Sequence, residues 1–184
     1  ASHAEFLTSL VPVQFDPFAP AIVRDMMAAS RVANVGPMAA VAGVLADYVG
    51  RDLLNYSRNV IIENGGDIFI HCLDDTRVGV FAGHSPLRDK IAMIIRREES
   101  PVGVCTSSGT VGHSLSFGKA DAVCVKATSA SLADAAATSI CNLVKSKDDI
   151  NRALHVGMDM DDVLGLLIII GKQFGVMGDI ELTE

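Results

Sequence analysis

Two oxygen-bearing side chains, those of Asp134 and Thr138, lie four residues apart in an alanine-rich segment. On a helix this spacing places both on the same face, and the alanines between them let another backbone approach closely. One carboxylate, one hydroxyl and a nearby carbonyl are hard oxygen ligands that suit Mg²⁺, which keeps several waters and usually bridges to a substrate phosphate. The spacing alone favours a structural alternative, in which the Thr138 hydroxyl bonds back to the Asp134 carbonyl and the carboxylate pairs with a loop amide.

A stretch rich in glycine and hydroxyl groups runs from Gly103 to Gly118. Successive amide groups in such a loop can form a concavity that binds phosphate or carboxylate. The stretch is not a Walker loop, because Ala120 follows Lys119 where Ser or Thr is required. It could be an ordinary surface loop, but loops this long without regular structure are uncommon unless they are functional. We therefore expect an anion to bind at Ser107, Ser108, Gly109 and Thr110.

His113 lies inside this stretch and is the candidate catalytic residue, because an imidazole can act near neutral pH as an acid, as a base or as a hydrogen-bond donor to a phosphate. An imidazole that only holds the loop together by hydrogen bonds fits the sequence equally well. A hydrolase arrangement of Ser108, His113 and Asp121 can also be written, but no G-x-S-x-G turn is present to expose the serine. This third interpretation is the weakest.

Asn64, Gly65, Gly66 and Asp67 form a second candidate binding segment. Asn-Gly-Gly between two apolar stretches is a strong signal for a tight hairpin turn. Such a turn could present the Asp67 carboxylate and the Asn64 amide to a ligand. Considered alone, the segment is more simply a hairpin turn.

The composition is that of a globular chain with a large core. The 184 residues are 49% hydrophobic, which excludes disorder and collagen-like repetition. The formal net charge of −7 leaves no broad basic surface, so we do not expect a nucleic acid partner. No C-x-x-C pair occurs and the longest apolar run is too short to span a bilayer. We expect reduced thiols and a cytoplasmic protein; a leader removed before Ala1 and the oligomeric state stay open.

The elements that must position these residues follow from hydrophobic periodicity and turn signals. The sequence predicts an irregular segment over residues 1–18 and helices over residues 19–33, 37–50, 131–144 and 148–155. Asn34 suits the end of the first helix, and Ser129 or Ser131 suits the cap of the third. It predicts strands over residues 59–63, 67–72, 77–82, 90–96, 102–106, 120–126, 164–170 and 176–182. Helix, helix, strand, strand occurs twice, and Gly-Asp-Ile recurs at 66–68 and 178–180. We expect an α+β domain over 1–184 with two pseudo-repeats, about 19–96 and 102–184, each an antiparallel sheet covered by a helix pair.

Four segments together resemble a family of short ApbE-like proteins. They are residues 36–43, 63–67, 105–113 and 133–138, which read GPMAAVAG, ENGGD, CTSSGTVGH and ADAAAT. The likeness spans nearly the whole chain. These proteins are distant relatives of the ApbE FAD:protein FMN transferases, a superfamily first named for a thiamine biosynthesis lipoprotein.

The resemblance carries implications for the site and the fold. In ApbE enzymes an Ala-Asp-x-x-x-Thr helix supplies magnesium ligands, which implies that Asp134 and Thr138 bind Mg²⁺ and reverses the preference stated above. A Gly-Gly-Asp strand start near the flavin corresponds to residues 65–67, and a Ser-Gly segment near FAD corresponds to residues 108–109. The implied fold is a duplicated T-fold-like arrangement of antiparallel sheets and paired helices.

The chain departs from the ApbE enzymes in two places. The enzymes carry a Lys-Gly-Tyr element at the helix that here reads Met38 to Gly43, where neither lysine nor tyrosine occurs. They also carry a His-Ile-Ile-Asp-Pro-x-Thr-Gly stretch after the Ser-Gly segment, and the corresponding residues here, Gly112 to Asp121, lack it. In the enzymes, both missing elements serve flavin binding and phosphoryl-transfer geometry. The metal and loop features of the family are kept in this chain.

Together these features predict Mg²⁺-dependent binding or transfer of a flavin nucleotide, FAD or FMN, or of another small phosphate-bearing ligand. Loop amides of residues 107–110, with His113, are expected to hold the phosphates against Mg²⁺ on Asp134 and Thr138. The alternative is a non-catalytic binding or assembly protein that keeps the fold and the pocket.

Overall fold

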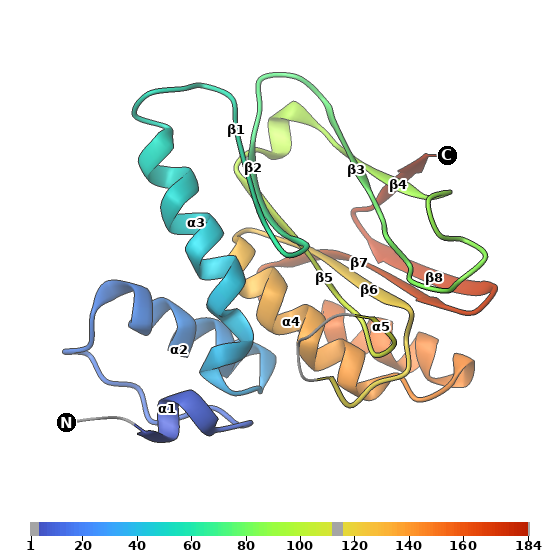
Figure 1. The fold of residues 1–184 in the computed structure, drawn as a ribbon, viewed down its shortest axis with the longest axis horizontal. Helices are drawn as coiled ribbons and strands as arrows, with labels where there is room; N and C mark the ends of the chain where they lie inside the picture. The colour runs from blue at the N-terminus through green and yellow to red at the C-terminus, as the bar shows by residue number, and fades with distance from the viewer. Residues whose placement is uncertain (1–3, 112–115, 184) are drawn as a thin grey trace.

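A computed structural model describes residues 4–111 and 116–183 of the chain as an α+β arrangement with antiparallel strand pairing (Figure 1). The larger sheet has six strands in the order β1-β2-β5-β6-β7-β8. These strands are β1 Val60–Asn64, β2 Asp67–His71, β5 Val102–Ser107, β6 Ala122–Ala127, β7 Val163–Ile170 and β8 Gln173–Gly178. The smaller sheet has the order β3-β4-β9, formed by β3 Thr76–Gly79, β4 Ala92–Ile95 and β9 Glu181–Thr183.

The helices lie on one face of the larger sheet and the smaller sheet lies on the other (Figure 1). The α-helices are α1 Ala4–Thr8, α2 Ala21–Ala33, α3 Val41–Leu53, α4 Ala130–Leu143 and α5 Ile150–Met158, and the 3₁₀ helices are η1 Pro37–Ala40, η2 Arg97–Glu99 and η3 Lys147–Asp149. Alternate residues of a strand point to opposite faces. In β6, Val123 and Val125 therefore join the helix-side core, while Ala122 and Cys124 join the core beneath the smaller sheet.

Local signals predicted several element ends well. Asn34 ends α2 in the left-handed conformation, with φ of 55°, which asparagine tolerates better than most residues. Ser129 caps α4, because its hydroxyl accepts a hydrogen bond from the Leu132 amide at 3.3 Å. Pro37 begins a helical segment as expected, although that segment is the 3₁₀ helix η1 that leads into α3.

The two halves of the chain share one sheet, which differs from the expectation of a separate sheet for each half. β5 pairs with both β2 and β6, so the six strands are continuous across the midpoint of the chain. The strand expected over 176–182 is two strands, because the chain turns at Gly178, with φ of 80°, and β9 leaves for the smaller sheet. The 1–18 segment, expected to be irregular, contains the short helix α1.

The repeated tripeptide does not occupy equivalent positions. Residues 66–68 begin β2 at the first hairpin, whereas residues 178–180 follow the end of β8. The order helix, helix, strand, strand does recur, as α2-α3-β1-β2 and α4-α5-β7-β8. The order of elements, and not the short sequence match, therefore relates the two halves.

No single helix among the described residues is long and apolar enough to cross a membrane. α2 and the η1–α3 segment reach that length and composition only as a pair bent by 103°. All four cysteines are free thiols, and Cys72 alone is partly exposed.

Candidate functional site

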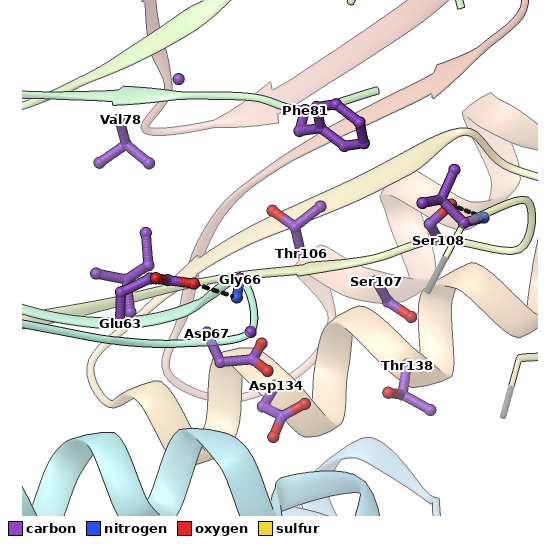
Figure 2. A pocket seen from close by; sticks show the side chains of 14 residues that line it. Glu63, Gly66, Asp67, Val78, Phe81, Thr106, Ser107, Ser108, Asp134 and Thr138 are labelled. Atoms are coloured by element: carbon purple, nitrogen blue, oxygen red, sulfur yellow. Dashed lines mark hydrogen bonds between the residues drawn. The ribbon is translucent and has the colours of Figure 1, made fainter. Parts of the chain in front are cut away.

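A cavity of about 630 Å³ gathers most of the predicted site residues (Figure 2). It lies where the β1–β2 hairpin, the end of β5, the helix α4 and the strand β3 meet. The predicted residues that line it are Gly65, Gly66, Asp67, Ser107, Ser108, Asp134 and Thr138. Segments far apart in the sequence thus form one site.

The β1–β2 hairpin positions Asp67. Gly65 and Gly66 form its two-residue turn with φ of 68° and 103°, a conformation that glycine adopts at little steric cost. Asn64 and Asp67 are cross-strand partners on either side of the turn, and the Gly66 amide donates a hydrogen bond to the Glu63 carboxylate at 2.8 Å. The expected hairpin turn is confirmed, and it holds Asp67 at the first position of β2.

The packing of α4 against α3 positions Asp134. The amide of Gly43, in the first turn of α3, donates a hydrogen bond to Asp134 Oδ2 at 2.9 Å. Gly43 makes this close crossing possible, because a Cβ atom there would lie 2.2 Å from the Ala130 carbonyl oxygen. The Asp134 carboxylate therefore accepts from the amide end of a helix, where the dipole favours negative charge.

The side chains of Asp67 and Asp134 lie next to each other at the floor of the cavity (Figure 2). Burial raises the pKa of Asp67 to about 6 and the charge of Glu63 adds to the rise, while a hydrogen bond from the Cys105 thiol opposes it. Burial, followed by the charge of Asp67, raises the pKa of Asp134 well above its usual value, against the effect of the α3 amides. The charged side chains among the described lining residues are all acidic.

These donors fit a magnesium ion. Thr138 lies one turn beyond Asp134 on α4, and its hydroxyl lines the same cavity (Figure 2). The described residues contain no group of three His, Cys, Asp or Glu side chains that could hold a metal. Two carboxylates and one hydroxyl leave coordination positions for water or ligand oxygens, which is how Mg²⁺ is usually bound.

The glycine- and hydroxyl-rich loop contributes side chains to the cavity, while the amides of residues 109–111 donate hydrogen bonds to other protein groups. Ser108 Oγ accepts hydrogen bonds from the amides of Thr110 at 3.1 Å and Val111 at 3.0 Å. The Gly109 amide donates to the Ala120 carbonyl at 2.9 Å. Neither Gly109 nor Thr110 lines the cavity, whereas Ser107 and Ser108 do.

Asp121 anchors this loop. Its carboxylate accepts a hydrogen bond from the Thr110 hydroxyl at 3.1 Å and another from the Gly171 amide at 2.7 Å. Ser108 is likewise engaged with loop amides. His113 lies outside the described residues. The two bonds of Asp121 tie the loop to the β7–β8 turn.

Asn64 lies beside the site without lining the cavity. Its side-chain amide donates a hydrogen bond to the Ala42 carbonyl oxygen at 3.3 Å. Asn64 therefore contacts the first turn of α3, the same turn that binds Asp134.

Sequence reasoning missed the upper wall of the cavity. Val78, Gly79 and Phe81 line it from β3 and the residues that follow. No local motif marks them, because β3 lies there only as part of a sheet that needs β4 and the C-terminal strand β9. A second cavity, of about 480 Å³ and lined mainly by apolar side chains of α1, η1 and α3, shares Asp67, Asp134 and Thr138 with the first.

The fold is that of the ApbE proteins. The chain is similar to the crystal structure of ApbE from Thermotoga maritima, with a TM-score of 0.58 at 19% identity over 77% of this chain and 50% of that one. It is also similar to the flavin transferase ApbE from Vibrio cholerae, with a TM-score of 0.54 at 17% identity over 79% of this chain and 50% of that one. The chain spans about half the length of these solved structures.

Within this fold class, the chain belongs to the family described as AbpE bacteria, which it matches over residues 1–174. It is 46% identical over 183 residues to a UPF0280 protein of Methanococcus aeolicus, covering 97% of this chain and 74% of that protein. It is 43% identical over 180 residues to a UPF0280 protein of Methanocaldococcus jannaschii, covering 95% of this chain and 73% of that protein. The resemblance to ApbE-like proteins found from the sequence is confirmed.

Proposed function

We propose that this protein binds a phosphate-bearing ligand through Mg²⁺ held by Asp67, Asp134 and Thr138. The observation that carries the proposal is the pair of neighbouring carboxylates, partly buried, with only acidic charges among the described lining residues. Such a pair repels a bare phosphate and attracts a divalent cation, and the cation then supplies the positive charge that a phosphate needs.

A flavin nucleotide, FAD or FMN, is the ligand that we propose. The flavin transferase ApbE of Vibrio cholerae has this fold. The two cavities, of about 630 and 480 Å³, meet at Asp67, Asp134 and Thr138. A ligand with phosphates at these three residues can extend in both directions, which suits FAD, a molecule with a group at each end of a pyrophosphate.

Cleavage or transfer at that pyrophosphate is the activity that we propose, with His113 as the candidate acid or base. The ion supplies charge neutralisation at the phosphates, while Ser107 and Ser108 offer hydroxyl groups beside them. The alternative is that the chain binds the ligand without turnover, as a binding or assembly protein. The absence of the Lys-Gly-Tyr and His-x-x-Asp-Pro elements is the observation that favours this alternative.

We also propose that the chain is one ApbE-like domain built by duplication of a T-fold-like unit. The recurrence of two helices followed by two strands supports this origin. A related pair of units would explain why the candidate site lies where the first hairpin meets the first helix of the second half.

Thermal-shift measurements with FAD, FMN, ADP and thiamine phosphates, each with and without Mg²⁺, test the proposal. We expect a rise in melting temperature with a flavin nucleotide that requires Mg²⁺ and is lost in Asp134→Ala. Asp148→Ala, at an exposed aspartate that lines neither cavity, is the matched control and should keep the shift. No shift with any of these ligands would overturn the proposal.

Assays of the ligand separate turnover from binding. Conversion of FAD that is lost in His113→Ala, while the Mg²⁺-dependent thermal shift is kept, would support catalysis. A thermal shift without any conversion would support the binding or assembly protein.

A further inference from the structure

The first turn of α3 is hydrogen-bonded to both elements that carry the carboxylate pair. On one side, the Gly43 amide donates to Asp134 Oδ2 at 2.9 Å. On the other side, the carbonyl of the preceding residue, Ala42, accepts the Asn64 side-chain amide at 3.3 Å. Two neighbouring residues of one helical turn are therefore bonded to α4 and to the β1–β2 hairpin.

The hydrogen bond between Asn64 and Ala42 lies close to Asp67. Asn64 and Asp67 are directly opposite each other across the two-residue turn. The hairpin backbone is further fixed by the bond from the Gly66 amide to Glu63. A hydrogen bond that fixes Asn64 therefore also fixes where the Asp67 carboxylate lies.

The contact between α3 and α4 at Gly43 is closely packed. A Cβ atom on Gly43 would lie 2.2 Å from the Ala130 carbonyl oxygen and 2.9 Å from Asp134 Cβ. The two helices cross here with backbone against backbone, so the α4 backbone that carries Asp134 cannot approach closer to the start of α3.

We propose that Asn64 is a positioning residue, not a ligand, and that it sets the separation of Asp67 and Asp134 by tying the hairpin to the turn of α3 that binds Asp134. This inference rests on the proposed function, because the paired carboxylates are taken as the cation site. Two neighbouring carboxylates have no attraction for each other, so their separation without the ion depends on outer contacts of this kind.

The affinity for Mn²⁺, measured in a double-mutant cycle, tests the proposal. Mn²⁺ is the spectroscopic probe, because its binding can be followed to high Mn²⁺ concentration even when the affinity is weak. Asn64→Ala should weaken Mn²⁺ binding by about tenfold. Asn55→Ala is the matched control, because the Asn55 side chain likewise donates to a backbone carbonyl, that of Asp52, at 3.0 Å but lies away from the cavity. We expect Asn55→Ala to leave the affinity unchanged.

The second arm of the cycle separates positioning from ligation. If Asn64 acts through the carboxylate of Asp67, the effect of Asn64→Ala must disappear in an Asp67→Asn background, because coupled residues are not additive. An equal loss in both backgrounds would overturn the proposal, and so would an Asn64→Ala protein that binds Mn²⁺ like the wild type. A wild-type protein that binds no divalent cation would instead overturn the proposed function itself.

Discussion

Asp47 and Asp134 cap each other's helices. Asp47 of α3 accepts hydrogen bonds from the amides of Ala130 at 3.0 Å and Ser131 at 2.9 Å, at the start of α4. Asp134 of α4 accepts from the Gly43 amide at the start of α3. Asp47 is only 2% exposed, whereas Asp134 lines both cavities. The two carboxylates thus share a structural role, and only Asp134 is open to a ligand.

This pair predicts that stability and metal binding can be separated. Asp47→Ala leaves two α4 amides without their acceptor and should lower the free energy of unfolding by about 1–2 kcal/mol, with Mg²⁺ affinity retained. Asp134→Asn keeps an oxygen for the Gly43 amide but removes the charge, so Mg²⁺ affinity should fall by at least about tenfold with little change in stability. Urea unfolding and Mg²⁺ titration of both variants check this. Loss of Mg²⁺ binding in Asp47→Ala alone would contradict it.

The carboxylate pair also predicts how stability depends on pH without a divalent cation. The pKa of Asp67 is raised to about 6 in the folded protein, so the folded state binds this proton more tightly than the unfolded state. The resulting stabilisation is present at low pH and is lost as the pH rises through about 6. Melting temperature in EDTA should therefore fall mainly between about pH 4 and 6, the range in which the folded state keeps this proton and the unfolded state has lost it. Asp67→Asn should flatten this slope, and an unchanged slope in that variant would assign it to other groups.

The close crossing of α3 and α4 predicts a large cost for one methyl group. Gly43→Ala places Cβ against the Ala130 carbonyl oxygen, which belongs to the backbone and cannot rotate away. The free energy of unfolding should fall by about 1–3 kcal/mol, as measured by urea denaturation. Gly79→Ala is the control, since no atom lies within 4 Å of a Cβ atom there; a similar loss in both variants would show that crowding is not the cause.

The two ion pairs of Lys126, with Glu99 and with Asp179, are expected to differ in strength. Its side chain is 1% exposed, and Nζ lies 2.6 Å from Glu99 and 2.9 Å from Asp179. The Glu99 side chain is 16% exposed and that of Asp179 is 74% exposed, so water screens the second pair more. Glu99→Gln should therefore destabilise the protein more than Asp179→Asn in urea unfolding. Equal losses would show that burial does not set the difference.

Removing the lysine itself should cost more than removing either acid. Lys126→Ala leaves two carboxylates without their shared cation and opens space in the core beneath the smaller sheet, so we expect a loss of about 3–5 kcal/mol. Lys126→Met fills most of that space and should lose less. A Lys126→Met protein as unstable as Lys126→Ala would assign the whole effect to charge.

Sequence reasoning worked best where a structure is decided within a few residues. The Asn-Gly-Gly turn, the stop at Asn34 and the cap at Ser129 follow from local backbone chemistry and are present. It was less successful for the larger sheet, because which strands pair depends on contacts between distant segments. β9 illustrates the limit: the three residues after the Gly178 turn join a sheet whose other strands come from the first half of the chain.

By itself, the sequence determined the parts of the site: a hairpin that must turn at its glycines, a helix with an acid and an alcohol on one face, and membership of an ApbE-like family. Only the tertiary structure decided that Asp67 lies next to Asp134, that Asn64 turns to α3 instead of the cavity, and that β3 closes the cavity from above. The reason is physical: local backbone preferences fix turns and caps, whereas the meeting of two carboxylates depends on how separate elements pack around a common core.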